Sequence, residues 1–320
     1  MRIGVFTALW QDQPFEAALD KAAAAGVTAV EIGCGGYPGS QHCPVDDLLA
    51  SASKRKEYLK AITSRGLILS GLSVHGNPVH PNRGIAQEHD QAFRKACKLA
   101  GLLDVPVVNM FSGLPGGAPA DTMPNWVTCP WPNEFTAILK YQWDEVTVPY
   151  WKEAVKVADS NKVKVAFEMH PGMLIYNVET LLRLRNAVSP TLGCNFDPSH
   201  LWWNGVDPVA AIRALGNAIF HVHGKDCYVD GLNIEVNGCN DNKPYAQIPK
   251  RSWTFRSIGY GHDAKVWKDI VSALRLVGYD YVISIEHEDP LMSQGEGLAK
   301  GIALLKEACI VEKPGAMFWA

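Results

Sequence analysis

The chain has 320 residues, of which 47% are hydrophobic and 20% are charged, and it carries a formal net charge of −3 with a pI of about 6.4. This length and composition are typical of a globular protein with a large hydrophobic core. The nearly balanced charge and the lack of any run rich in Lys and Arg argue against nucleic acid as a partner.

The sequence also argues against a membrane partner. Residues 1–10 are apolar but short and rich in β-formers, and no small-residue cleavage site follows them. No apolar run approaches the roughly 18 residues that a membrane helix needs. The 8 cysteines include no CxxC pair and are interpreted as reduced thiols. We therefore expect a cytoplasmic protein.

Hydrophobic periodicity and the placement of Gly and Pro predict strands that alternate with helices along the chain. The predicted strands cover 3–7, 29–33, 67–74, 106–111, 163–168, 192–197, 218–223 and 281–286, and the predicted helices cover 14–26, 53–65, 86–103, 145–159, 178–188, 208–215, 266–277 and 297–309. Residues 112–134 are expected to form a long loop, 226–262 a polar excursion after strand seven, and 310–320 a tail.

This alternation predicts an α/β protein, a single (β/α)8 barrel that extends over residues 1–320 as one domain. A doubly wound parallel sheet is the alternative. It would need a Gly-rich phosphate-binding turn after the first strand, where the sequence instead reads Thr-Ala-Leu-Trp-Gln-Asp.

The last four predicted strands each end on a side chain that can bind a metal, namely Glu168, Asp197, His223 and Glu286. The carboxyl ends of barrel strands form the active face, so these side chains should converge. Crowded carboxylates repel one another unless a cation lies among them. Three acids and one imidazole suit Mn²⁺, Mg²⁺ or Co²⁺, with Zn²⁺ as an alternative. Helix capping or loop salt bridges explain any one acid, but they do not explain four equivalent positions.

The segments around these side chains read Phe-Glu168-Met-His-Pro, Asn-Phe-Asp197-Pro-Ser-His200, His-Val-His223-Gly-Lys-Asp226 and Ile-Glu286-His-Glu. They resemble the motifs of the xylose isomerase-like TIM-barrel superfamily. The closest branch is its sugar phosphate isomerase/epimerase group, which contains ketose 3-epimerases, inosose dehydratases and 3-keto-glycoside epimerases. The resemblance spans essentially the whole chain.

The resemblance implies a ligand set and a catalytic pair. Glu168, Asp197, His223 and Glu286 would bind one divalent cation, most often Mn²⁺ in this family. Glu168 and Glu286 would also exchange protons with opposite faces of the substrate, and His200 would contact the substrate.

Two positions depart from the ketose 3-epimerases. Leu174 stands where they carry a further glutamate, six residues after the first ligand, and Val229 stands where they carry an arginine. Both family residues help to hold a free ketose, so these differences indicate another substrate. The excursion 226–262 resembles that of longer members, which act on inososes or 3-keto-glycosides.

Further residues are candidates for binding substrate because they lie at strand ends or in loops of the expected active face. They are His75, Asn109, Trp131, His170, Lys225 and Asp226. Lys225 and Asp226 are also expected to orient His223. The alternatives are turn capping for His75 and Asn109, a packed loop histidine for His170 and a solvated pair for Lys225 and Asp226. Simple packing is the alternative for Trp131, Trp10, Trp202 and Trp203. The apolar tail 315–320 favours docking on a neighbouring subunit, and hence a homo-oligomer.

The sequence therefore predicts an enzyme, a divalent-metal-dependent epimerase or isomerase of a keto-sugar, inosose or 3-keto-glycoside. It would remove a proton next to a carbonyl and form a metal-stabilised enediolate. A lyase that eliminates a β-substituent from the same enediolate is an open alternative. An endonuclease IV-like DNA repair enzyme would need more metal ligands and a basic face. A metal-free binding protein is disfavoured by the four intact ligand positions.

Overall fold

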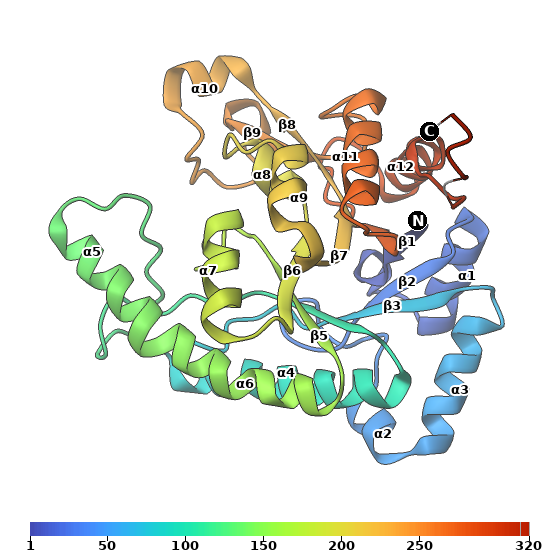
Figure 1. Cartoon of the computed structure of the whole chain (residues 1–320), viewed down its shortest axis with the longest axis horizontal. Helices are drawn as coiled ribbons and strands as arrows, with labels where there is room; N and C mark the ends of the chain where they lie inside the picture. Colours follow the sequence, from blue (N-terminus) through green and yellow to red (C-terminus); the bar gives the residue numbers. More distant parts are fainter. Residues whose placement is uncertain (314, 320) are drawn as a thin grey trace.

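The computed structural model describes residues 1–313 and 315–319, and it shows a closed barrel of parallel strands surrounded by helices (Figure 1). Around the barrel the strands are β1 (Arg2–Phe6), β10 (Val282–Ile285), β7 (Ile219–Gly224), β6 (Leu192–Phe196), β5 (Lys164–Glu168), β4 (Val107–Met110), β3 (Ile68–Ser73) and β2 (Ala29–Gly33). Parallel pairing of β1 with β10 closes the ring. The predicted (β/α)8 fold is thus confirmed.

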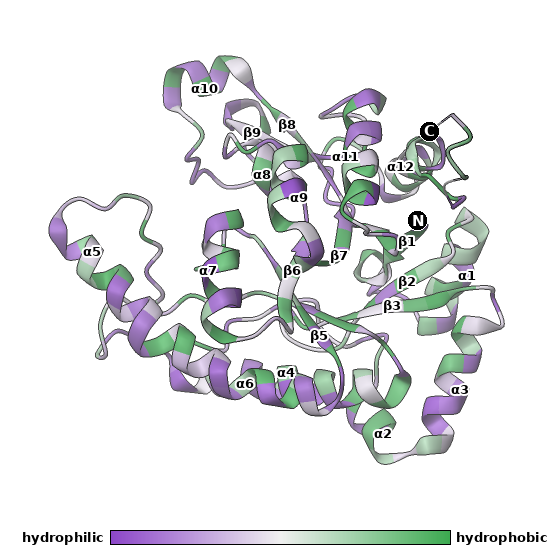
Figure 2. Cartoon of the chain, viewed as in Figure 1, coloured by the Kyte–Doolittle hydropathy of each residue, from purple (hydrophilic) through white to green (hydrophobic). Residues whose placement is uncertain are grey.

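The helices that follow the strands bury apolar residues in the hydrophobic core. Figure 2 shows hydrophobic and hydrophilic residues interspersed along these helices. In α4 (Arg83–Leu103), Phe93, Ala96 and Ala100 are fully buried, at the spacing of three and four residues that forms one helix face. The other long helices are α1 (Phe15–Ala25), α3 (Ala52–Thr63), α6 (Val148–Ser160), α7 (Val178–Val188), α9 (Pro208–Leu215), α11 (Ala264–Leu276) and α12 (Gln294–Ala308).

Several connections contain more helix than the sequence predicts. A short helix, α2 (Val45–Ala50), precedes α3. The expected loop 112–134 leads into α5 (Asn133–Lys140), which continues through a π-helical segment (Tyr141–Thr147) into α6. Every residue of α5 is at least partly exposed, and the helix projects from the barrel at the left of Figure 1. The helix contains apolar residues, but none of them is buried, so it has no side that faces the core.

The excursion 226–262 is a folded unit and not merely a polar loop. Strands β8 (Asp226–Val229) and β9 (Trp253–Arg256) pair as an antiparallel ribbon, and α10 (Gly231–Asn237) lies at its far end. The ribbon has its own hydrophobic cluster of Trp203, Cys227, Trp253 and Phe255. A short helix, α8 (Ser199–Trp202), directly after β6 leads to this cluster.

Asp226 fastens the end of the excursion to its beginning. Its carboxylate accepts hydrogen bonds of 2.9 to 3.3 Å from the backbone N–H groups of Gly259, Gly261 and His262 and from the indole of Trp267. The ring of His262 lies 2.9 Å from the same carboxylate. Asp226 was expected to bind substrate or to orient His223. Its hydrogen bonds are instead taken up by the excursion, which corrects that expectation.

Two further expectations concern membrane helices and the apolar C-terminal tail. Within the described ranges, no helix is both long and apolar enough to cross a bilayer. Met317, Phe318 and Trp319 are 66%, 92% and 72% exposed, so the described part of the apolar tail presents its side chains to solvent. Pro314 and Ala320, which belong to the tail expected to dock on a second subunit, lie outside the described residues.

Replacing Asp226 by alanine should loosen the excursion, because the backbone N–H groups of Gly259, Gly261 and His262 would lose their partner. We expect the free energy of unfolding to fall by about 3 kcal/mol, since these hydrogen bonds are made to a buried, charged group. Hydrogen exchange across 257–263 should become faster. The control is Asp230→Ala, which removes only the N-cap of α10 and should cost about 1 kcal/mol. Equal, small losses in the two variants would contradict the anchoring role of Asp226.

Candidate metal centre and active site

Four side chains converge at the carboxyl ends of neighbouring strands. Glu168 is the last residue of β5, Asp197 directly follows β6, His223 lies in β7, and Glu286 directly follows β10. Each offers one ligand atom, and these atoms all lie within 4.8 Å of one another. The structure therefore brings together the four residues that the sequence selects as metal ligands.

The geometry of these four residues fits a bound cation. His223 Nδ1 lies 3.2 Å from Glu168 Oε2, 3.4 Å from Glu286 Oε2 and 4.0 Å from Asp197 Oδ2. His223 Nδ1 and Asp197 Oδ2 are buried and have no hydrogen-bond partner among the described residues. Buried polar atoms are costly without a partner, and a shared cation would supply one. Three carboxylates and one imidazole suit a hard or borderline divalent ion.

Glu31, in β2, is a member of the site that the sequence analysis missed. It is fully buried, and its two carboxylate oxygens lie 3.0 and 3.1 Å from His223 Nε2. Because a carboxylate can only accept, Nε2–H donates to Glu31 and the lone pair of Nδ1 faces the other acids. Burial alone would raise the pKa of Glu31, but the nearby rings of His223 and His221 outweigh it and hold that pKa well below its ordinary value.

Asn109 supports Glu31 from below. Its amide donates to Glu31 Oε1 at 2.9 Å and lies 3.2 Å from His221 Nδ1. Ser73 also donates to Glu31. Asn109 was expected to bind substrate, but it is fully buried and its amide contacts Glu31, Ser73 and His221. Its position in β4 turns its side chain into the barrel interior, and this corrects that expectation.

Two neighbouring histidines fix the carboxylate of Glu168. His75 Nε2 lies 3.1 Å from Oε2, and His200 Nε2 lies 3.0 Å from Oε1. Burial alone would raise the pKa of Glu168, but the nearby rings of His200, His223 and His75 outweigh it and hold that pKa well below its usual range. At Asp197, burial outweighs the nearby His200 and Lys225, and the pKa is raised. His200, expected to contact substrate, is 1% exposed and also lies 3.4 Å from Asp197.

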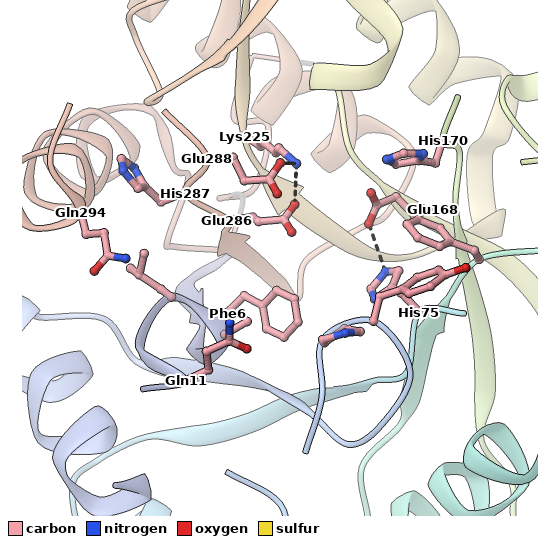
Figure 3. Close-up of a pocket in the computed structure, with 15 residues that line it drawn as sticks. Phe6, Gln11, His75, Glu168, His170, Lys225, Glu286, His287, Glu288 and Gln294 are labelled. Atoms are coloured by element: carbon pink, nitrogen blue, oxygen red, sulfur yellow. Dashed lines mark hydrogen bonds and ion pairs between the residues drawn. The ribbon is translucent and has the colours of Figure 1, made fainter. Parts of the chain in front are cut away.

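A cavity of about 360 Å³ opens over this cluster. Figure 3 shows Glu168, His75 and His170 on one side of it and Lys225, Glu286 and Glu288 across from them, with Phe6 and Gln11 at its lower edge. Of the residues predicted to bind substrate, His75, His170 and Lys225 thus line the cavity. Their contact with a substrate remains a prediction.

Lys225 is a buried cation in this cavity. Its Nζ lies 3.0 Å from Glu286 Oε2, 2.5 Å from Glu288 Oε2 and 4.2 Å from the centre of the Phe255 ring. Burial would lower the pKa of Lys225, but Glu286 and Glu288 outweigh it and hold that pKa well above its ordinary value. Lys225 was expected to orient His223. It bridges two glutamates instead, and this makes it a positioning group for Glu286.

His170 and Trp131 differ in their surroundings. His170 Nδ1 lies 2.6 Å from the carbonyl oxygen of Pro171, and burial lowers the pKa of His170 to about 3, so the ring is neutral. Trp131 is 75% exposed and is not among the described residues that line the cavity. Its place in the projecting loop before α5 accounts for this departure from the expected substrate contact.

The other tryptophans considered above take part in packing, as do the two residues that depart from the ketose 3-epimerases. Trp10 and Trp203 are buried, and Trp202 stacks on His262 with ring centres 3.9 Å apart. Leu174 is buried in the main core, and Val229 packs on the hydrophobic cluster of the excursion.

Comparison with known proteins agrees with this fold. Over 297 residues, which are 92% of this chain and 95% of the relative, the sequence is 42% identical to the uncharacterized protein YfiH of Bacillus subtilis (strain 168). A segment of 80 residues is 34% identical to an inosose dehydratase of Clostridium tetani (strain Massachusetts / E88) and covers 25% of this chain and 27% of that protein. The crystal structure of a D-tagatose 3-epimerase-like protein superimposes with a TM-score of 0.65 at 22% identity, and the match covers 96% of this chain and 97% of that chain. The sequence pattern of the family described as xylose isomerase-like TIM barrel matches residues 19–308, and the chain therefore belongs to this family.

Proposed function

We propose that this protein is a divalent-metal-dependent epimerase or isomerase of a neutral keto sugar or sugar derivative. The observation that carries the proposal is the convergence of Glu168, Asp197, His223 and Glu286 beside a cavity that Glu168 and Glu286 line. Two of their buried ligand atoms lack partners among the described residues. The sugar isomerase or lyase reactions that we consider all begin with removal of a proton next to a carbonyl, and this site has the groups for that step.

The four converging residues would hold the metal. When bound, a divalent cation supplies Lewis-acid chemistry, which polarises a substrate carbonyl oxygen and stabilises the charge of the enediolate. The mixed set of three carboxylates and one imidazole favours Mn²⁺, with Mg²⁺, Co²⁺ and Zn²⁺ as alternatives. Glu31 would keep the Nδ1 atom of His223 aimed at the metal by accepting from Nε2–H.

Glu168 and Glu286 would move the protons. Their carboxylates approach from opposite sides of the cavity, so each can reach a different face of a substrate carbon (Figure 3). Glu168 is held by His75 and His200, and Glu286 is held by Lys225. A carboxylate fixed in this way needs little rearrangement before the proton transfer. Removal from one face and return to the other inverts the carbon, and transfer between neighbouring carbons isomerises the sugar.

The charges of the cavity favour a neutral substrate. Three carboxylates line it, from Glu168, Glu286 and Glu288, against the single ammonium of Lys225, which already bridges two of them. In the part of the chain that the structure describes, no arginine lines this cavity. With a divalent cation bound as well, the four carboxylates of Glu168, Asp197, Glu286 and Glu288 exceed the positive charges of the cation and Lys225 by one, so a phosphate or carboxylate group on the substrate would still meet net repulsion. The same charges disfavour DNA as a substrate.

A lyase is the second candidate, and the environment of Lys225 favours it. Elimination from the enediolate needs a proton for the departing hydroxyl group, and the ammonium of Lys225 is a donor inside the cavity. Its partner Glu288 has a side chain that is 49% exposed, so the proton can be replaced from solvent. The partial similarity to an inosose dehydratase points in the same direction.

Exchange of solvent deuterium tests the proposal. The Mn²⁺-loaded protein is incubated in D₂O with neutral ketohexoses, inososes and keto-glycosides, and the products are read by NMR. Deuterium at the carbon next to the carbonyl, in a product of inverted or isomerised structure, would support the first candidate. An unsaturated product would support the lyase. No exchange with any of these sugars by protein that carries one metal per chain would contradict both.

Replacing Glu286 by glutamine should abolish turnover. The amide cannot accept the proton, and loss of a general base lowers rates by about 10²- to 10⁴-fold. The variant is assayed after its metal content has been brought to that of the wild-type protein, so that loss of metal is separated from loss of the base. Substantial residual activity in the metal-loaded variant would remove Glu286 from the proton-transfer role.

Replacing Glu31 by glutamine should weaken Mn²⁺ binding by about 10- to 100-fold, because the charged acceptor that orients His223 is lost. Affinity is measured by competition with a fluorescent chelator. Ser70→Ala is the matched control, since the Ser70 hydroxyl lies 3.5 Å from His221 in the same buried network but does not touch His223. Unchanged affinity in Glu31→Gln, with an unchanged melting temperature of the metal-free protein, would contradict the orienting role.

A further inference from the structure

A second cavity, of about 450 Å³, lies beside the first. It is lined by His170, Tyr245, Thr254, Phe255, Glu288 and Pro290. His170 and Glu288 line both cavities, so the two cavities are adjacent at these side chains. In Figure 3 both residues lie in the upper part of the view, on the side of the first cavity away from Phe6 and Gln11.

The excursion builds most of the second cavity. Thr254 and Phe255 belong to β9, and Tyr245 lies in the loop before it. The Tyr245 ring stacks on Phe255, with centres 5.9 Å apart and an angle of 23° between the planes. The guanidinium of Arg251 lies 4.4 Å from the Tyr245 ring centre. Tyr245 is thus supported by its neighbours while its side chain remains 56% exposed.

Phe255 connects the second cavity to the candidate metal centre. Its ring lies 4.2 Å from Lys225 Nζ and packs edge-on against His200, with centres 5.3 Å apart. Lys225 in turn contacts Glu286, and His200 contacts Glu168. A group bound against Phe255 therefore lies one side chain away from both proposed proton-transfer residues.

The lining matches a sugar ring. Tyr245, Phe255 and Pro290 present flat apolar surface, while Thr254 and Glu288 offer hydrogen-bonding groups. Sugars have the same two-sided character, with apolar C–H faces and hydroxyl groups around the ring, and binding sites combine apolar walls with a few placed polar groups. An anionic occupant is disfavoured, because Lys225 is paired with two glutamates and Arg251 donates to the backbone carbonyls of Trp253 and Lys243.

We propose that the second cavity binds the distal ring of a neutral two-ring substrate, a keto-disaccharide whose oxidised ring lies at Glu168, Asp197, His223 and Glu286. The glycosidic bond would then pass between His170 and Glu288, where the cavities are adjacent. This inference rests on the proposed function and adds the class of substrate. A single-ring ketose would leave the aromatic wall of the excursion without a contact.

The first experiment compares substrates with one and two rings. Deuterium exchange is measured for keto forms of maltose, cellobiose, sucrose and trehalose and for the keto form of methyl glucoside. At least one disaccharide should have a kcat/KM about tenfold above that of the methyl glycoside, which corresponds to about 1.4 kcal/mol. Tyr245→Ala should remove this advantage and leave the methyl glycoside unaffected, and Tyr245→Phe should keep it.

Tyr228→Ala is the matched control. Tyr228 lies on β8 of the same excursion and is 45% exposed, and it is not among the described residues that line either cavity. The control should keep the advantage of the disaccharide. Equal kcat/KM values for all sugars in the wild-type protein, or an advantage that survives Tyr245→Ala, would overturn the proposal.

A binding titration separates this inference from the proposed reaction. The same sugars are titrated into the Mn²⁺-loaded wild-type, Tyr245→Ala and Tyr228→Ala proteins by calorimetry. Tighter binding of a disaccharide that depends on Tyr245, without deuterium exchange, would support the second cavity and reject the proposed reaction. Exchange with the methyl glycoside, without any preference for a disaccharide in rate or binding, would support the reaction and reject the second cavity. Absence of measurable binding of every disaccharide would also overturn the inference.

Discussion

The contact between Glu31 and His223 is the interaction on which the candidate site depends. A histidine ring can present either nitrogen, and here a buried acceptor at 3.0 Å from Nε2 decides which one faces the other acids. Asn109 and Ser73 hold Glu31 in turn. The interior of the barrel is therefore part of the candidate site, because its polar network sets the orientation of a side chain at the barrel mouth.

The carboxylates around His223 can be crowded together because each one has its own support. Glu168 receives hydrogen bonds from two histidines, and Glu286 is paired with the ammonium of Lys225. Asp197 has one oxygen bonded to the backbone N–H of Ser199 and the other without a partner in the described residues. Buried charge of this kind is tolerated only where something compensates for it. In a set of ordinary salt bridges every buried polar atom would have a partner. Here Asp197 Oδ2 and His223 Nδ1 have none among the described residues, and this favours a bound cation.

The sequence predicted the candidate site correctly where a strand ends on a side chain that can bind a metal. The apolar runs before Glu168, Asp197, His223 and Glu286 predicted both the barrel and the residues at its mouth. Glu31 has the same signal, an acid inside an apolar strand, but it stands in the middle of its strand, where burial depends on neighbours that are distant in sequence. Asp226 and Asn109 were misjudged because proximity to the site along the chain does not reveal which way a side chain turns. The ribbon of the excursion was hidden by the polar residues between its two strands.

The excursion enters and leaves the barrel at nearly the same point, since Asp226 at its start lies 2.9 Å from the ring of His262 at its end. When the two ends of a segment are held together, the entropic cost of closing the loop grows only slowly with the number of residues between them. Its length and sequence can therefore change while strands β7 and β10, which carry or precede His223 and Glu286, keep their positions. Specificity in such a barrel can evolve, or be engineered by grafting, as an interchangeable part beside a constant reaction centre.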